Sequence, residues 1–225
     1  MTTPLSPEVA AYIASSYPHN HDYRVVRGKL KPRWKLWRRL GRLQRLYPEP
    51  LRELLDLSSC KGFFVLDAAQ RPTCERALGI DIHAPDLDAS RAVAGHLGLR
   101  GARFEELTLS DLAERIGEFG GPFQTTLLVN TYPYLFFGSD RSDEHVPDHD
   151  ELFRRMASVT SERLIFSNRI EFDVLPRHIQ RRAAELGLEG GYDGRAIRAA
   201  AEKHFELKMQ RPLGRIPLWL LRPRH

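Results

Sequence analysis

The stretch Leu54-Leu55-Asp56-Leu57-Ser58-Ser59-Cys60-Lys61-Gly62-Phe63-Phe64, followed by Ala77-Leu78-Gly79-Ile80-Asp81-Ile82, decides the fold. An apolar strand leads into a turn of small residues, a helix follows, and a second apolar strand ends on an acid. This order is typical of the nucleotide-binding half of a doubly wound α/β fold, where ligands bind outside the carboxyl ends of the strands. Asp81 lies nineteen residues beyond Gly62, a spacing that suits hydrogen bonds to the hydroxyls of a ribose.

The alternation of strands and helices continues along the chain, which predicts a parallel sheet. Strand-like runs cover 53–58, 77–82, 102–107, 125–130 and 163–168, and helical segments cover 62–69, 86–98, 109–118, 149–159, 174–186 and 193–204. Two further strand-like runs, 205–210 and 216–222, are joined by a short connection with Gly and Pro, which predicts an antiparallel hairpin. The predicted fold is α/β: a Rossmann-like, doubly wound sheet, mostly parallel, with a C-terminal antiparallel β-hairpin strand.

Composition narrows the class of protein. The 225 residues carry a net charge of +5, and no apolar run approaches the roughly 20 residues that span a bilayer, so no membrane partner is expected. The first residues lack the basic and apolar regions of a secretory signal. Two cysteines, Cys60 and Cys74, indicate reduced thiols and are too few to suggest a metal site. We therefore expect a cytoplasmic protein.

The segment before the first predicted strand is unusually basic. Helices are predicted over 7–15 and 33–46, and we divide the chain into a basic helical cap, 1–50, and a Rossmann-like domain, 51–225. Between Tyr23 and Pro48 there are ten Lys or Arg residues and no acid. Such a segment can bind phosphates, including those of a nucleic acid. The alternative is an amphipathic helix that buries Trp34, Trp37, Leu40 and Leu43 and leaves its arginines in solvent.

On these residues the chain resembles the class I S-adenosylmethionine-dependent methyltransferases, over roughly residues 50–222. The first motif of that family is an acid followed by three alternating glycines. Asp56 holds the acidic position, Ser58 and Cys60 hold the first two glycine positions, and Gly62 holds the third. The acid that ends the second strand and the closing hairpin also match. The resemblance implies S-adenosyl-L-methionine as cosubstrate and methyl transfer as the reaction.

The resemblance also implies a set of site residues. Asp56 would lie near the amino group of the cosubstrate, the turn would line its methionine part, Asp81 would hold the ribose, and Ile82 would contact the adenine. The cosubstrate-binding residues implied in this way are Asp56, Ser58, Ser59, Cys60, Gly62, Asp81, Ile82, Leu107, Thr108 and Asn130. Ser58 and Cys60 depart from the family because a Cβ disfavours the backbone conformations that glycine adopts. Thr108 departs too, because the family often has an acid there.

The fourth predicted strand ends in Asn130-Thr131-Tyr132-Pro133-Tyr134, where the family faces the transferable methyl group. Methyl transfer is an in-line displacement, so positioning of the nucleophile supplies much of the rate. Asn130 would orient an amine or hydroxyl, and Tyr132 or Tyr134 would stack on a planar acceptor or attract the sulfonium methyl by a cation–π interaction. Asn130 and Tyr132 are the predicted catalytic residues. Lys29, Trp34, Tyr134 and Asn168 are the predicted acceptor-binding residues. The aromatics of this segment have a second interpretation, as core residues, which we favour for Phe136 and Phe137.

A polar stretch with histidines lies between the fourth strand and the next helix. It contains Asp143, Glu144, His145, Asp148, His149 and Asp150. We predict no metal site there, because the acids lack a recognisable ligand spacing and Asp148 reads as the N-cap of a helix. A histidine in this stretch would serve as a general base on a lid, or the stretch is simply a solvated loop.

The leading hypothesis is therefore a methyltransferase acting on a small-molecule acceptor or, through the basic segment, on a nucleic acid. The alternative is a catalytically degenerate methyltransferase-like domain that serves as a binding or scaffold module, motivated by the missing glycines. A nicotinamide-dependent dehydrogenase would also use Asp81, but the chain lacks the Gly-x-Gly-x-x-Gly turn. The sequence leaves the acceptor and the oligomeric state open.

Overall fold

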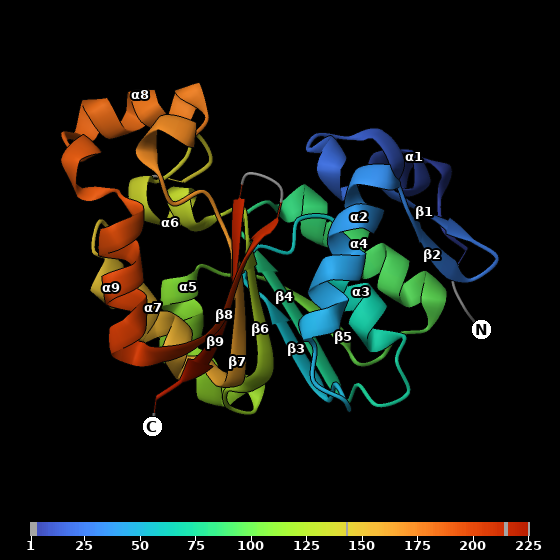
Figure 1. Cartoon of the computed structure of the whole chain (residues 1–225). Helices are drawn as coiled ribbons and strands as arrows, with labels where there is room; N and C mark the ends of the chain where they lie inside the picture. The colour runs from blue at the N-terminus through green and yellow to red at the C-terminus, as the bar shows by residue number, and fades with distance from the viewer. Residues whose placement is uncertain (1–3, 143, 214–215, 225) are drawn as a thin grey trace. The chain divides into compact units, whose positions relative to one another are not determined.

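A computed structural model describes residues 4–142, 144–213 and 216–224 of the chain. It divides into two compact units, Met1–Thr108 (unit one) and Leu109–His225 (unit two). Seven strands form a mixed sheet, and a separate two-stranded hairpin precedes it (Figure 1). The predicted fold class is confirmed, since the sheet is mostly parallel and ends in antiparallel strands.

Unit one contains the first half of the alternating strands and helices. Its strands β3, β4 and β5 lie in the order β5-β4-β3 and are parallel, with Asp56 opposite Gly79 and Asp81 opposite Glu106. The elements of this unit are α1 (Pro7–Ser15), β1 (Tyr23–Val26), β2 (Lys29–Pro32), α2 (Trp34–Leu43), β3 (Glu53–Asp56), α3 (Phe63–Ala69), β4 (Arg76–Asp81), α4 (Ala84–Leu97) and β5 (Ala102–Glu106). Short 3-10 turns follow α1 and α2, at His19–His21 and Gln44–Leu46.

Burial agrees with the interior position of β3 and β4 in the sheet. Leu54, Leu55, Leu78 and Ile80 are all at most 1% exposed, so consecutive residues are covered on both faces of the sheet. Helices α3 and α4 supply that cover by packing on β4 and β5. Helix α4 ends at Gly98, which has a φ of 67° and so adopts the left-handed conformation typical of a C-cap glycine.

The buried face of α2 differs from the predicted one. Trp34 and Trp37 are 65% and 56% exposed, whereas Leu36 and Leu43 are completely buried. The prediction was wrong because residues three apart in an α-helix are rotated by about 60° from full alignment, so Trp34 and Leu43 lie on opposite sides. The true apolar stripe is Leu36, Leu40 and Leu43, spaced four and three residues apart.

The hairpin β1–β2 was not predicted. Its two-residue turn is Arg27-Gly28, with φ values of 50° and 71°, and both residues therefore have the positive φ of the tight turns that match strand twist. The strands on either side carry many cations, which hid their alternation. The Arg-Gly dipeptide between two short alternating runs was the signal that pointed to this turn.

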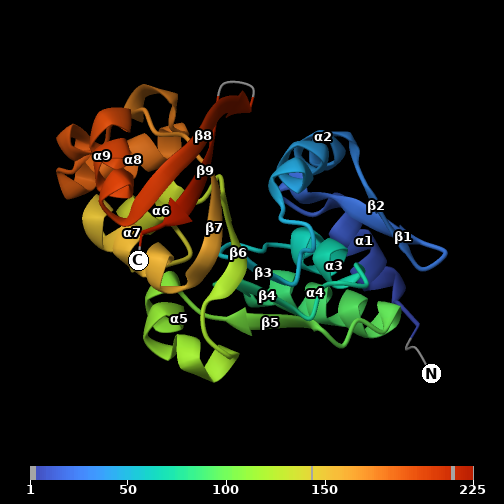
Figure 2. The same ribbon diagram turned by 60° about the horizontal axis from the view of Figure 1, so that its bottom comes forward.

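Unit two holds the second half, in the order β6-β7-β9-β8 (Figure 2). Strands β6 and β7 are parallel, and β9 lies antiparallel between β7 and β8, as the predicted closing hairpin requires. Gly214 and Arg215, in the predicted connection, lie outside the described residues. The elements are α5 (Leu109–Arg115), β6 (Phe123–Val129), α6 (Tyr132–Phe137), α7 (His149–Ser158), β7 (Thr160–Ser167), α8 (Arg177–Leu186), α9 (Gly194–His204), β8 (Phe205–Leu213) and β9 (Ile216–Pro223).

The core of unit two is aromatic. Phe166 of β7 stacks on Trp219 of β9, with ring centroids 5.1 Å apart, and Trp219 is 1% exposed. Phe136 and Phe137 are buried, which confirms their assignment to the core. Within the described ranges, we find no helix with the length and apolar character that a membrane crossing requires.

Candidate functional site

The turn that follows β3 is the main candidate site of unit one. It runs from Asp56 to Gly62, which has a φ of 73° and precedes α3. A Cβ on Gly62 would lie 2.5 Å from Ser90 Oγ and 2.7 Å from a ring carbon of Phe104, so only glycine fits. Cys60 has a φ of 49°, although it is not glycine. The turn therefore keeps the left-handed backbone at position 60 even though a side chain is present.

Asp81 holds this strained turn in place. Its Oδ2 accepts a hydrogen bond from the Cys60 N–H at 2.8 Å, and its Oδ1 accepts one from the His83 N–H at 3.1 Å. Burial raises the pKa of Asp81, with the charge of Asp86 adding to the effect, while the backbone donors oppose it. Asp81 thus caps the following segment and also links the ends of β3 and β4. Its neighbour Ile82 is 37% exposed and offers an apolar surface beside the turn.

Asp56 ends β3 beneath the turn. Its carboxylate is 3% exposed and accepts a hydrogen bond from the Ser58 N–H at 3.3 Å. Burial raises the pKa of Asp56 to about 7, with a further increase from the charge of Asp81 and opposing contributions from the Ser58 N–H and Arg39. A carboxyl group with this pKa can exchange a proton near neutral pH, and a bound cation would shift it toward the ionised form.

Ser59 and Lys61 point away from the turn's surface. Ser59 packs its side chain against Gly79, where an added Cβ would lie 2.6 Å from Ser59 Cβ, and its N–H donates to Ile80 O at 2.9 Å. Lys61 is completely buried, and its Nζ donates to Asp22 Oδ1 and to Ser16 O, both at 2.6 Å. The Tyr23 hydroxyl donates to Lys61 O at 2.8 Å. The segment before β1 therefore holds the turn in place through Lys61, a contact that the sequence did not predict.

A second contact joins the same segment to the start of α4. Asp86 is 1% exposed, and its Oδ1 accepts a hydrogen bond from the Tyr12 hydroxyl at 2.9 Å. Its Oδ2 accepts one from His83 Nδ1 at 2.9 Å and receives the Cys60 thiol at 3.7 Å. The region predicted as a separate cap, 1–50, is thus joined to the turn by buried polar contacts within unit one.

The other predicted residues of unit one lie around this turn or on the surface. Leu107 and Thr108 follow β5 and are half-buried. Lys29 is exposed on β2, and Trp34 is exposed at the start of α2. Unit one therefore brings Asp56, Cys60, Gly62 and Asp81 together as predicted, whereas no contact links Lys29 or Trp34 to them among the described interactions.

Asn130 is the most unusual residue of unit two. It follows β6 with a φ of 62°, in the left-handed region, and its N–H donates to Ser167 O at 2.8 Å. Its buried Oδ1 has no hydrogen-bond partner among the described residues. An unsatisfied acceptor on a strained backbone is uncommon and marks a position where a donor from a ligand would be stabilising.

Asn168 has a structural role, which corrects its predicted contact with an acceptor. It is completely buried, and its Oδ1 accepts hydrogen bonds from the Thr131 and Tyr132 N–H groups at 2.7 and 2.9 Å. Its Nδ2 donates to Leu128 O at 2.8 Å. The side chain therefore caps the start of α6 and fixes the turn that carries Asn130.

Tyr132 also lies in the core, which corrects its predicted stacking on an acceptor. It is completely buried, and its hydroxyl lies 2.8 Å from His149 Nδ1. Because His149 Nε2 lies 2.9 Å from Gly191 O, an acceptor only, Nε2 carries the proton and the Tyr132 hydroxyl donates to Nδ1. Burial lowers the pKa of His149, so the ring is neutral. Tyr134 is half-buried, and its hydroxyl lies 3.2 Å from His178 Nε2.

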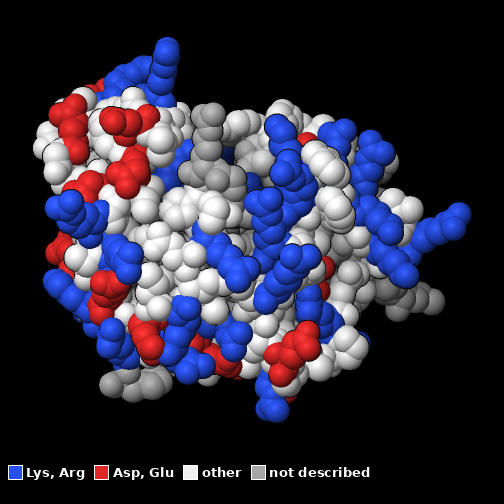
Figure 3. All heavy atoms as spheres, in the orientation of Figure 1, with Lys and Arg blue, Asp and Glu red and all other residues white. Residues whose placement is uncertain are grey.

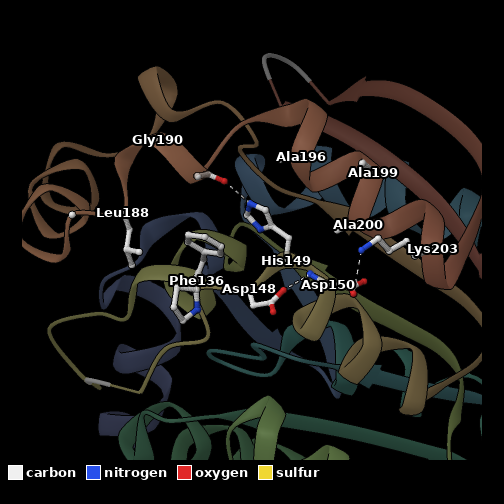
Figure 4. A pocket seen from close by; sticks show the side chains of 13 residues that line it. Phe136, Asp148, His149, Asp150, Leu188, Gly190, Ala196, Ala199, Ala200 and Lys203 are labelled. Carbon is white, nitrogen blue, oxygen red and sulfur yellow. Dashed lines mark hydrogen bonds and ion pairs between the residues drawn. The ribbon is translucent and has the colours of Figure 1, made fainter.

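A cavity of about 600 Å³ lies beside His149 in unit two (Figure 4). The residues that line it include Phe136, Leu188 and small residues of α9, and its polar groups already have internal partners. Asp148 caps α7 as predicted, and Asp150 pairs with Lys203 at 3.2 Å and His204 at 2.8 Å. Both ring nitrogens of His149 are occupied, so it is not a free general base. Asp143, part of the polar stretch, lies outside the described residues, which contain no cluster of three or more His, Cys, Asp or Glu side chains suited to a metal.

Comparisons with known proteins bear on the fold. No protein-family model and no curated protein sequence matches the chain. Among solved structures, the N-terminal domain of EvdMO1 with SAH bound matches 83% of this chain and 79% of its own at 16% identity and a TM-score of 0.54. The N-methyltransferase NodS from Bradyrhizobium japonicum WM9 matches 84% of this chain and 97% of its own at 10% identity and a TM-score of 0.55.

A third match is the bifunctional kinase-methyltransferase WbdD, over 86% of this chain at 18% identity and a TM-score of 0.58. The chain spans only about two fifths of the length of WbdD and of full-length EvdMO1, 40% in both cases. At these identities the similarity concerns the fold, and it agrees with the strand orders and the closing hairpin described above. The chain therefore has the class I S-adenosylmethionine-dependent methyltransferase fold.

Proposed function

We propose that this protein is an S-adenosylmethionine-dependent methyltransferase that acts on a small-molecule or nucleic-acid acceptor. The observation that carries the proposal is the backbone of the glycine-poor turn. Cys60 adopts a φ of 49°, Gly62 a φ of 73°, and Asp81 accepts the Cys60 N–H at 2.8 Å. The turn therefore has the conformation that close approach of a ligand requires, despite Ser58 and Cys60.

In this proposal, the residues of unit one hold the cosubstrate. Asp56 pairs with its amino group, and the backbone from Ser58 to Gly62 lines its methionine part. Asp81 receives the ribose hydroxyls, and the exposed Ile82 contacts the adenine, with Leu107 and Thr108 at its edge. When bound, the cosubstrate supplies an electrophilic methyl group on a sulfonium.

Asn130 is proposed to position the acceptor. Its buried Oδ1 has no hydrogen-bond partner among the described residues, and an N–H or O–H group of the acceptor would satisfy it. We assign Asn168 and Tyr132 to the support of this turn, because both are buried and hydrogen-bonded inside unit two. Two free thiols, Cys60 and Cys74, support a reducing compartment such as the cytoplasm.

The test is the affinity of the cosubstrate product, S-adenosylhomocysteine, for three proteins. We expect Asp81→Asn to weaken binding by at least tenfold relative to the unaltered chain, because the amide loses the charged acceptor for the ribose hydroxyls. The matched control is Asp88→Asn on the exposed side of α4, where the carboxylate is 72% exposed and pairs with Arg91. Equal affinities for all three proteins would refute the site assignment. The degenerate scaffold remains the alternative function and predicts no binding to any of them.

A further inference from the structure

The outer face of α2 and the hairpin β1–β2 form a charged surface that the proposed methyl transfer does not explain. Figure 3 shows basic side chains gathered over these elements. We name this the basic tryptophan surface and define it by its exposed residues: Arg24, Arg27, Lys29, Lys31, Arg33, Lys35, Arg38, Arg42, Arg45, Trp34 and Trp37. No acid occurs between Tyr23 and Pro48, although Arg33 of this surface lies 3.5 Å from Asp22 Oδ2.

The cations lie next to one another within each element. Arg24 and Lys31 are directly paired across the hairpin, and like charges at paired positions are destabilising. Arg38 and Arg42 are four residues apart on α2, which is again a repulsive spacing. Lys35 adds a positive charge in the first turn of α2, where the helix dipole disfavours it. This arrangement costs stability in the isolated protein and is relieved by a polyanion.

Two tryptophans lie among these cationic side chains. The rings of Trp34 and Trp37 are stacked, with centroids 5.2 Å apart and an interplanar angle of 22°, and both remain more than half exposed. The guanidinium of Arg38 lies over the Trp34 ring, 5.7 Å from its centroid. Stacked rings beside cations present an apolar face on which a further planar ring can stack, next to groups that bind phosphate.

From this geometry we infer that the basic tryptophan surface binds single-stranded nucleic acid, with bases stacking on the Trp34–Trp37 pair and phosphates contacting the surrounding Lys and Arg. A lipid surface fits less well. A membrane-surface helix segregates its apolar residues on one face, whereas the apolar stripe of α2, Leu36 and Leu43, is buried inside the unit. On the exposed side of α2, the guanidinium of Arg38 instead lies over the ring of Trp34.

The inference deepens the proposed function by favouring the nucleic acid among its two acceptor classes, but its test is separate, because binding is measured without cosubstrate. The probes are fluorescein-labelled decamers of uridine and of thymidine, titrated by anisotropy at several salt concentrations. We expect binding of both decamers, with Trp34→Ala/Trp37→Ala weakening it about tenfold or more, while Trp34→Phe/Trp37→Phe retains most of the affinity. These side chains are exposed, so the variants should fold, and circular dichroism checks that they do.

Charge reversal tests the phosphate contacts separately. Single strands release about 0.7 counterions for each phosphate that is neutralised, so Arg38→Glu/Arg42→Glu should lower the slope of log affinity against log salt by about one or more. The matched control is Arg177→Glu/Arg181→Glu on α8 of unit two, which makes the same change of charge at two exposed arginines and should leave the slope nearly unchanged.

The inference would be overturned by no binding of either decamer at low salt, by affinities that Trp34→Ala/Trp37→Ala leaves unchanged, or by equal losses in the α2 and α8 charge reversals. Vesicles of phosphatidylserine and phosphatidylcholine provide the competing surface. Tryptophan-dependent binding to these vesicles that exceeds binding to the decamers would also overturn it, in favour of a lipid partner.

Discussion

Replacement of Asp56 by Asn is predicted to stabilise the protein increasingly as the pH rises. Asp56 is 3% exposed, and burial raises its pKa to about 7, roughly three units above the usual value for an aspartate. The folded protein therefore holds the proton more tightly than the unfolded chain does. The stability that this provides is fully present below about pH 4 and is lost as the pH rises through about 7.

The size of the effect follows from the same shift. At a pH where Asp56 is ionised in both the folded and the unfolded protein, each pH unit between its two pKa values lowers the free energy of unfolding by about 1.4 kcal/mol. Between pH 5 and pH 8 the unaltered protein should lose about 3 kcal/mol in its free energy of unfolding through this one group. The neutral amide of Asp56→Asn has no such loss, so the gap between the two proteins should widen by about that amount.

The assay is urea denaturation of both proteins at pH 5, 6, 7 and 8, followed by circular dichroism. Asp173→Asn is the control, because it makes the same change of side chain at an exposed position. Curves for Asp56→Asn and the unaltered protein that stay parallel from pH 5 to pH 8 would refute the reasoning. That result would mean that Asp56 is already ionised in the folded protein.

Three further predictions concern the same turn. Affinity for S-adenosylhomocysteine should rise from pH 6 to pH 8, because the ligand's ammonium pairs with Asp56 only once this carboxyl, with a pKa of about 7, has lost its proton. Calorimetry across the same pH range should show no such rise for Asp56→Asn. Gly62→Ala should lower the free energy of unfolding by about 2 kcal/mol or more, because the φ of Gly62 is 73° and the new Cβ would lie 2.5 Å from Ser90 Oγ. The control is Gly190→Ala, whose Cβ would have no atom within 4 Å. Equal losses of stability for the two variants in urea denaturation would contradict this prediction. Lys61→Met should cost about 3 kcal/mol, because it removes the buried cation at Asp22 Oδ1 while Arg33 stays 3.5 Å from Oδ2; thermal unfolding should show partial recovery in Lys61→Met/Asp22→Asn, and a single variant as stable as the unaltered protein would exclude this role for Lys61.

Local sequence patterns predicted most of the strands and helices of the sheet. Period-two and fully apolar runs identified β3, β4 and β6, and a short Gly-containing connection identified the closing hairpin, because these signals depend on neighbouring residues only. The same reasoning missed α6, because the strand was predicted to end at Asn130 and no helix was predicted in the residues that follow it. Pro133 in the first turn was the signal for a helix start there.

The site residues of the turn were predictable from the sequence, whereas the roles of side chains whose hydrogen-bond partners lie in distant elements were not. Asp56, Gly62 and Asp81 lie together because the ends of neighbouring parallel strands meet at one edge. Asn168 was assigned to the acceptor because it is polar and ends a strand, but its real partners, two N–H groups of α6, belong to a different element. Lys61 was overlooked because lysine usually reads as solvated, and only the fold brings Asp22 to it.

The central claim is that a turn with serine and cysteine in place of two glycines still binds S-adenosylmethionine. The most direct measurement is calorimetric titration of the purified chain with S-adenosylmethionine and S-adenosylhomocysteine at pH 8, where Asp56 is ionised. The account predicts saturable binding in the micromolar range with one ligand per chain. Absence of heat and of saturation at millimolar concentrations of both ligands would contradict it and would favour the scaffold function.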